Sequence, residues 1–178
     1  MQRLEKTGYK SIDWSKWFSY EEGYLYWVVN KGSTAFKGHV AGAYNSKGYL
    51  RVQLNNKKYY VHRIIYELLV RSIPEGYDID HINNIRDDNR IENLRIATRQ
   101  ENCRNQSVRK TSKSGVKGVS FHKATQKYRA LIHINGKQQT VGYFKTIEEA
   151  KISYNNKAKE LYGEFAYQHE IQTCLSME

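Results

Sequence analysis

Cysteine and proline are scarce in this sequence, and long apolar runs are missing from it. The two cysteines, Cys103 and Cys174, form no Cys-x-x-Cys pair, so we expect no structural zinc site. No stretch approaches the ~20 apolar residues that a membrane-spanning helix needs. Residues 1–6 include no apolar segment of the kind found in secretory leaders. From these absences we expect an intracellular protein in a reducing compartment, the cytoplasm.

Acidic residues are absent from Asn102 to Lys145. The basic residues of the same stretch are Arg104, Arg109, Lys110, Lys113, Lys117, Lys123, Lys127, Arg129, Lys137 and Lys145. The formal net charge of the whole chain is +11, so nearly all of the excess lies here. A charge run this one-sided predicts phosphate binding. No amphipathic helix with a basic face accompanies it, which argues against a membrane surface as the partner.

What the sequence does contain is a polar segment, Asp78 to Asn105, with the features of a catalytic site. Asp80 and His81 end a short alternating run that predicts a strand. After an Asn/Asp-rich turn, Leu94 to Ala97 predicts a second strand that pairs back on the first. Asp80 and His81 would point to opposite faces and so could serve different tasks.

A helix is expected to follow these strands. Thr98 and Glu101 have the spacing of a capping box, which starts a helix near Arg99 and places Asn102 in its early turns. The segment therefore predicts a strand, loop, strand and helix in that order.

The residue types of this segment fit metal-assisted phosphodiester cleavage. Asp80 and the amide oxygen of Asn102 are hard oxygen donors, which suit Mg²⁺ or Mn²⁺. His81 has an ordinary pKa of ~6.5 and can accept a proton from water near neutral pH. An EF-hand calcium loop is excluded because Ile82 and Asn83 occupy positions that it needs for a ligand and a glycine.

The pattern DHINN…DDNRIENLR…TRQEN resembles the HNH, or ββα-metal, endonucleases of phages and mobile introns, from about Gly23 to Asn105. The resemblance implies that Asp80 and Asn102 bind one divalent metal, that His81 is the general base, and that Asn93 braces the loop between the strands. Asn102 stands where many relatives have His, which leaves the preferred metal open. The resemblance also implies 5′-phosphate and 3′-hydroxyl ends and a phage-encoded protein in a bacterial host.

Upstream of this motif we expect a small antiparallel sheet. Tyr24–Val29 and Tyr49–Leu54 predict strands, and the latter pairs through Asn55-Asn56 with a strand at Lys58–Val61. Trp14, Trp17 and Phe18 are spaced as the apolar face of a short helix that packs in the core.

The segment from His62 to Val70 predicts a helix that packs the sheet against the metal site. His62 is open to two interpretations, a phosphate contact or a hydrogen-bonded histidine at the start of this helix.

A second module is predicted after the motif. The helix signals are a capping box at Thr146 and a terminal Gly163, and the turn Asn135-Gly136 predicts a tight hairpin. The expected strands are Val116–His122, Tyr128–Ile134 and Gln138–Phe144. The module is thus a three-stranded antiparallel sheet packed on one helix.

Strand alternation predicts which residues of this sheet face the helix and which do not. Val119, Phe121, Tyr128, Ala130 and Ile132 suit the helix side. The opposite face would carry Lys117, Ser120, His122, Arg129, Leu131, His133, Gln138 and Thr140. A solvated face is one interpretation of this composition, and a sheet laid in the major groove of DNA is the other.

The segment from Ser114 to Tyr167 resembles the DNA-binding domain of plant ethylene-response factors, the APETALA type, which reads DNA with its sheet. The resemblance implies DNA contacts from Lys117, Ser120, His122, Arg129, His133, Gln138 and Thr140. The basic run separately predicts phosphate contacts from Arg104, Arg109, Lys110 and Lys113. Ser120, His122 and Thr140 are smaller or less basic than their counterparts, so the plant target sequence does not carry over.

Together these patterns predict an α+β protein with a nuclease domain at 1–105, a basic linker at 106–113, a DNA-binding domain at 114–167 and a tail at 168–178. The predicted function is metal-dependent cleavage of double-stranded DNA by a monomer or a DNA-induced dimer. Two alternatives stay open, a DNA-binding regulator with an inactive nuclease fold and an RNA-binding module.

Overall fold

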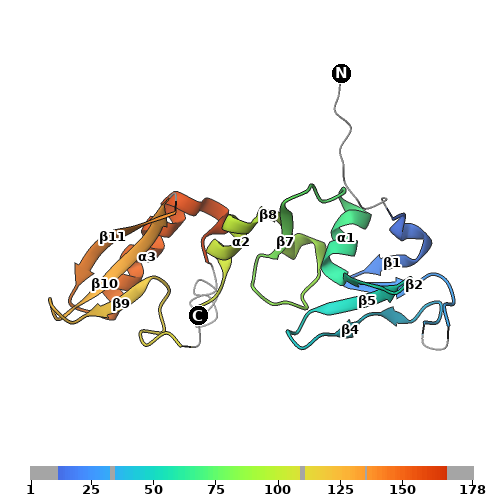
Figure 1. Ribbon diagram of the computed structural model, residues 1–178, viewed down its shortest axis with the longest axis horizontal. Helices are drawn as coiled ribbons and strands as arrows, with labels where there is room; N and C mark the ends of the chain where they lie inside the picture. Colours follow the sequence, from blue (N-terminus) through green and yellow to red (C-terminus); the bar gives the residue numbers. More distant parts are fainter. Residues whose placement is uncertain (1–11, 33–34, 109–110, 135, 168–178) are drawn as a thin grey trace, which may run out of the picture. The chain divides into compact units, whose positions relative to one another are not determined.

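The computed structural model describes residues 12–32, 35–108, 111–134 and 136–167. Antiparallel sheets and short helices build an α+β fold, as predicted (Figure 1). The chain divides into two compact units, Met1–Arg99 and Gln100–Glu178. The domain boundaries given above stay a prediction. In the parts of the chain that the structure describes, no helix has the length and apolar character needed to span a membrane.

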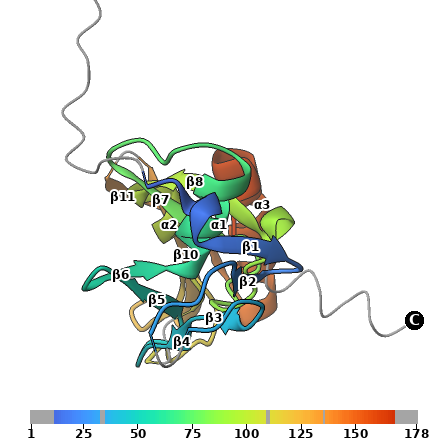
Figure 2. The same ribbon diagram turned by 90° about the vertical axis from the view of Figure 1, so that its right-hand side faces the viewer.

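Two small sheets form the beginning of the first unit, rather than one (Figure 2). The first sheet contains β1 (Phe18–Glu21), β2 (Tyr24–Trp27) and β3 (Val40–Ala41). The second contains β4 (Ala43–Tyr44), β5 (Leu50–Leu54) and β6 (Lys57–Tyr60). Asn55 and Asn56 make the β5–β6 turn at φ of 50° and 61°, the left-handed conformation that a tight hairpin requires.

The prediction of a helix over Trp14, Trp17 and Phe18 is wrong. A 3-10 helix, η1, covers only Trp14–Lys16, and Phe18 begins β1, where it pairs with Trp27. The expected packing is confirmed for Trp14 and Phe18, which are both buried. Helix α1 (Val61–Leu69) contacts both sheets, because its apolar face joins the same core.

The polar segment predicted to hold the site follows α1, and its two strands are joined by a long loop. Strand β7 (Tyr77–His81) pairs with β8 (Leu94–Thr98), and the 3-10 helix η2 (Ile91–Asn93) precedes β8 directly. Helix α2 (Arg99–Asn105) continues from β8 without a gap. The predicted order of strand, loop, strand and helix is confirmed.

The second unit has the predicted sheet and helix. Strands β9 (Val119–His122), β10 (Lys127–Ile134) and β11 (Lys137–Phe144) lie in the order β11-β10-β9. Helix α3 (Ile147–Tyr162) packs on all three strands, and a 3-10 helix, η3 (Gly163–Phe165), ends the fold (Figure 1). Thr146 and Glu149 form the predicted capping box, and Gly163 caps the helix at a φ of 54°.

The register of this sheet fixes its two faces. Ala130 and Ile132 are buried against α3, and Tyr128 is half-buried there, as alternation predicts. Phe121 is a partial exception, because it is 49% exposed, although its ring contacts the Tyr128 ring. A register shift between Ala130 and Leu131 places Val141 in a bulge. Ile134 pairs with Lys137, so the connection has the predicted length, although Asn135 itself lies outside the described residues.

Candidate active site

Asp80 and His81 lie at the end of β7, and both are buried. Asp80 pairs across the ladder with Arg95 of β8. The Nε and Nη2 atoms of Arg95 donate to Asp80 Oδ2 at 2.9 and 2.8 Å. Two charge-assisted bonds to a carboxylate inside the protein hold its orientation firmly. The side chains of this ion pair are only 6% and 10% exposed, so neither is free to turn into water.

The imidazole of His81 is enclosed by other rings. The His62 ring lies 4.9 Å from it in an edge-on arrangement, and the Tyr49 ring lies 6.0 Å away. Nε2 of His81 is 3.0 Å from Oδ1 of Asn89. Burial lowers the pKa of His81 below its usual value, against the opposing effects of the Asn89 hydrogen bond and of the Asp80 charge. The ring is therefore neutral at physiological pH and able to accept a proton.

Neither interpretation of His62 is confirmed. The side chain is buried under Tyr60, whose ring stacks on it at 5.2 Å. Its Nδ1 makes no hydrogen bond to any residue that the structure describes. Burial lowers the pKa of His62 to about 3. His62 thus acts as a neutral packing residue beside His81.

Asn93 closes the loop between β7 and β8. Its Nδ2 donates to the backbone oxygen of Asp88 at 2.7 Å and to Asn83 Oδ1 at 3.0 Å, and its Oδ1 accepts from the Asn83 backbone at 3.0 Å. Asp88 in turn accepts two bonds from Arg90 at 2.8 and 2.7 Å, which hold its pKa at about 2. Hydrogen bonds of Asn93 with Asn83 and Asp88 therefore hold the loop between β7 and β8 near both of its ends.

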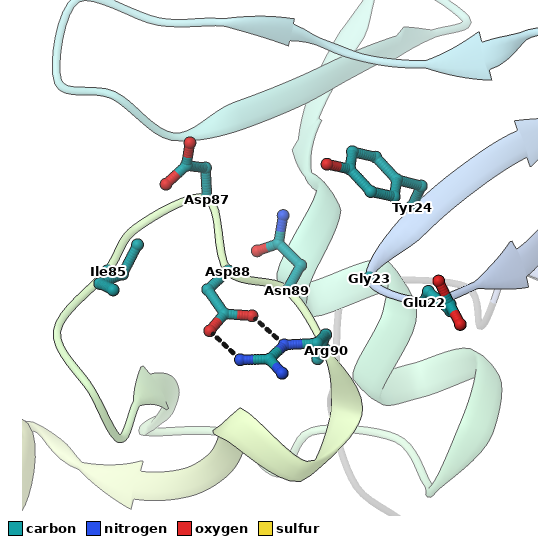
Figure 3. Close-up of a pocket in the computed structure, with 8 residues that line it drawn as sticks. All are labelled: Glu22, Gly23, Tyr24, Ile85, Asp87, Asp88, Asn89 and Arg90. Carbon is teal, nitrogen blue, oxygen red and sulfur yellow. Dashed lines mark hydrogen bonds and ion pairs between the residues drawn. The ribbon is translucent and has the colours of Figure 1, made fainter. Parts of the chain in front are cut away.

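A pocket of about 280 Å³ opens on the outer side of this loop. Figure 3 shows the Asp88–Arg90 ion pair within it and Asn89 immediately beside the pair. The lining residues are Glu22, Gly23, Tyr24, Ile85, Asp87, Asp88, Asn89 and Arg90. Since Asn89 also bonds His81, this residue connects the pocket to the imidazole.

Asn102 lies in α2, beyond the point where the chain divides into its two units. Asp80, His81 and Asn93 belong to the first unit. Across residues 12–32, 35–108, 111–134 and 136–167, no group of three or more His, Cys, Asp or Glu side chains is arranged so that it could hold a metal ion. Mg²⁺ does not need such a cluster, because it commonly binds through one or two protein oxygens, water and substrate phosphates. The carboxylate of Asp80 is an oxygen donor of the type that this ion prefers.

The residues proposed to face DNA are placed on the sheet of the second unit by its register. Arg129 pairs with Ser120 and Tyr143, and His133 pairs with Gln138, so these side chains share the face opposite α3. Thr140 pairs with Leu131 and His122 with Lys127. The described residues offer no hydrogen-bond partner to the buried Nε of Arg129.

Lys117 and Arg104 lie elsewhere. Lys117 precedes β9, and its Nζ donates to the backbone oxygens of Arg104 and Gln106, both at 2.5 Å. Burial lowers the pKa of Lys117 to about 8. The Arg104 guanidinium lies over the Tyr162 ring at 4.5 Å. Lys113 is exposed in the loop before β9, whereas Arg109 and Lys110 lie outside the described residues.

Sequence reasoning missed the roles of Arg95 and Asn89. Both lie within the motif, yet their partners depend on strand register and on the path of the loop. When β7 pairs with β8, Arg95 lies directly opposite Asp80. This pairing could have predicted the ion pair from the sequence. No local signal distinguished Asn89 from the other turn-forming residues around it.

Comparisons with known proteins find similarity in the segment that contains these residues. The model of an HNH endonuclease family matches residues 59–104, the segment from the end of β6 to α2. Protein 3.8 of Escherichia phage T7 is 33% identical over 105 residues, which are 59% of this chain and 86% of that protein. An uncharacterized HNH endonuclease of Acanthamoeba polyphaga mimivirus is 36% identical over 115 residues, which are 64% of this chain. This chain spans 59% of the length of the mimivirus protein.

One solved structure is also similar, that of the HNH homing endonuclease I-HmuI, from work on DNA binding and cleavage by that enzyme. The match has a TM-score of 0.41 and 22% identity, and it covers 79% of this chain and 77% of that chain. The family match and the mimivirus relative agree on the class that this segment resembles. Residues 59–104 of the chain are similar to the HNH endonuclease family.

Proposed function

We propose that this protein is a divalent-metal-dependent DNA endonuclease with its catalytic residues on β7, β8 and α2. The observation that carries the proposal is a buried His81 next to an oriented carboxylate, Asp80, inside the segment that the family model matches. A base and a hard oxygen ligand at neighbouring positions are what hydrolysis of a phosphodiester requires.

His81 takes a proton from a water molecule, whose oxygen then bonds to the phosphorus. The bond from phosphorus to the 3′ oxygen breaks, and that oxygen receives a proton from solvent. This leaves a 5′-phosphate and a 3′-hydroxyl end. Asp80 and Asn102 would hold the ion, and Arg95 keeps the Asp80 carboxylate in one orientation. A bound Mg²⁺ or Mn²⁺ supplies Lewis-acid stabilisation of the negative charge on the leaving oxygen.

The second unit selects the site by contacting double-stranded DNA. The face opposite α3 supports this role, because Arg129, His133 and Gln138 lie there together without an acidic neighbour in any of the three strands. Basic and amide side chains on a sheet can contact phosphates and base edges in the major groove. The flanking basic residues of the linker, Lys113 among them, add phosphate contacts.

Cleavage of supercoiled plasmid tests the nuclease. Wild type and His81→Ala are compared with Mg²⁺, with Mn²⁺ and with EDTA, and His39→Ala serves as a matched control because His39 is an exposed histidine of the same unit. We expect metal-dependent cutting that His81→Ala lowers by about 10²–10⁴-fold and His39→Ala leaves unchanged. Equal cutting by wild type and His81→Ala contradicts His81 as the base.

The rival function is a DNA-binding regulator that retains the nuclease fold as a scaffold. It predicts tight, salt-sensitive DNA binding with no cutting of any DNA, including DNA that contains the cognate site. The plasmid assay with a parallel binding assay therefore distinguishes the two functions. Competition between DNA and RNA in the binding assay tests the RNA-binding alternative.

A further inference from the structure

The further inference concerns Asn89 and rests on the proposed function. Asn89 is 1% exposed and lies in the loop between β7 and β8. The backbone N–H of Asn89 donates to the backbone oxygen of Asp87 at 3.0 Å. The side chain of Asn93 donates to the backbone oxygen of Asp88, the residue immediately before Asn89. The bonds that close the loop therefore also fix the backbone at Asn89.

The two ends of the Asn89 amide have different surroundings. Oδ1 is 3.0 Å from Nε2 of His81, whereas Nδ2 has no hydrogen-bond partner among the described residues. An unsatisfied buried N–H costs about 1–3 kcal/mol, so packing alone would favour an apolar residue of this size. What the side chain provides in return is an acceptor aimed at His81.

An acceptor at Nε2 decides which nitrogen of the neutral ring carries the proton. The rings of Tyr49 and His62 restrict the plane of the imidazole but cannot choose between its two nitrogens. When Nε2–H donates to Asn89, the lone pair is on Nδ1. We propose that Asn89 is a positioning residue that holds His81 as the Nε2–H tautomer and so makes Nδ1 the atom that takes the proton from water.

An amide performs this task without adding a negative charge beside the base. The charges of Asp80, Asp87 and Asp88 already act on His81, and each stabilises its protonated form. A carboxylate at position 89 would keep the acceptor but add a further charge. Asn89→Asp therefore preserves the hydrogen bond, and it loses no donor bond because Nδ2 makes none to the described residues. Asn89→Leu keeps the approximate volume and removes the acceptor.

The tautomer is measured by long-range ¹H–¹⁵N correlation of the full chain with ¹⁵N-labelled histidine, at about pH 8, where an ordinary imidazole is neutral. His81→Gln identifies the His81 signals by their loss. We expect the Nε2–H tautomer alone in wild type and in Asn89→Asp, and a mixture of tautomers in Asn89→Leu. A wild type with the proton on Nδ1, or a pure Nε2–H tautomer in Asn89→Leu, overturns the proposal.

Single-turnover cleavage with DNA saturated by protein is the second measurement. We expect Asn89→Leu to slow cleavage by about 10- to 10⁴-fold at unchanged DNA affinity, within the range for lost outer hydrogen bonds and wrong tautomers. Asn89→Asp should recover most of the rate, and Asn156→Leu, at an exposed position of α3, should match wild type. A slow Asn89→Asp with an intact fold and the Nε2–H tautomer overturns the catalytic part of the proposal.

The two measurements separate this inference from the proposed function. If wild type cuts no DNA with either metal, the nuclease function fails, and the imidazole spectrum still decides whether Asn89 fixes the tautomer. If Asn89→Leu does not fold, the comparison of wild type with Asn89→Asp carries both measurements.

Discussion

The two units place their polar side chains in opposite environments. In the first unit His62, Asp80, His81, Asn89 and Asn93 are all buried, and most of them bond one another or the loop between β7 and β8. Among the described residues of the second unit, only Asn105 is polar and buried, whereas the face of the sheet opposite α3 is polar and mostly accessible.

This difference corresponds to two physical tasks. Chemistry needs side chains held in one geometry, and buried, mutually bonded groups have little freedom to leave it. Contact with a polyanion needs accessible charge, and each charge contributes a similar and nearly independent increment. We therefore expect changes in the first unit to be large and coupled, and changes on the sheet of the second unit to be smaller and additive.

The largest expected effect is on DNA affinity. If the accessible face and the linker make about 6–10 phosphate contacts, affinity falls by about 10³–10⁵ between 50 and 200 mM salt. The rate of cleavage with DNA saturated should change far less, since the proposed catalytic groups His81 and Asp80 are buried. Filter binding and single-turnover cleavage at the same salt concentrations measure the two dependences. For His81→Ala we expect the same dependence of DNA affinity on salt as for wild type. A shallow slope would place most recognition outside the charged face.

The buried ion pair gives the next largest effect. Arg95→Met leaves Asp80 as a buried charge without its guanidinium partner, and such changes cost about 3–5 kcal/mol of unfolding free energy. The matched change in the second unit is Lys157→Met, which breaks an exposed pair with Glu160 and should cost less than about 0.5 kcal/mol. Amide exchange in each unit, measured over a range of denaturant concentrations, gives the cost of each of the two substitutions. Equal costs would remove the distinction between the units.

The second unit nevertheless has a buried contact that does not tolerate change. Gly118 has a φ of +70°, and a Cβ on it would overlap the Tyr154 ring and lie 2.7 Å from the Leu131 carbonyl oxygen. We expect Gly118→Ala to cost about 2–4 kcal/mol, from strain at positive φ and overpacking. Gly115→Ala is the control, because Gly115 has a φ of +65° and nothing within 4 Å of its Cβ position.

The measurement for Gly118→Ala is amide exchange resolved by unit. Protection should fall in β9–β11 and α3 and should stay unchanged in β7 and β8. Loss of protection in both units at once would mean that they unfold as one cooperative body, and the comparison would then describe two surfaces of a single domain.

Local signals allowed much of this fold to be predicted from sequence. Alternation and a capping box identified β10 and α3, because strand faces and helix starts depend on residues close in the chain. The strands β3 and β4 were missed, since two residues are too few to show a period. Phe18 was assigned to a helix because its spacing from Trp14 fits one face of a helix. The same spacing also fits the observed turn followed by a strand.

For the site, too, the residues could be predicted from local sequence, but their partners could not. Asp80 and His81 stand out by type and position, but the partners that determine their behaviour are not local. Arg95 reaches Asp80 across a register, and Asn89 reaches His81 by the path of a loop. His62 was open to two interpretations, a phosphate contact or a hydrogen-bonded histidine at the start of a helix. Its surroundings of rings could not be inferred from its neighbours in the chain.

His62 gives the smallest of these effects and the only one that depends on acid. Its folded pKa is about 3, below the ordinary value of 6.5, so the unfolded chain binds a proton there that the folded chain does not. The contribution of His62 to the free energy of unfolding is fully present above about pH 6.5 and is lost as the pH decreases, by roughly 3 kcal/mol at pH 4.5. His81 acts in the same direction. Thermal unfolding between these two pH values measures the loss.

His62→Leu should remove most of the His62 contribution to this acid sensitivity. It adds no unsatisfied group, because the buried Nδ1 has no hydrogen-bond partner among the described residues. His39→Leu, at an exposed position of the same unit, should leave the dependence on pH as it is in wild type. If His62→Leu keeps the full dependence, then other groups of the first unit carry it, and the ring pair of His62 and His81 is not the acid-sensitive part of the buried network.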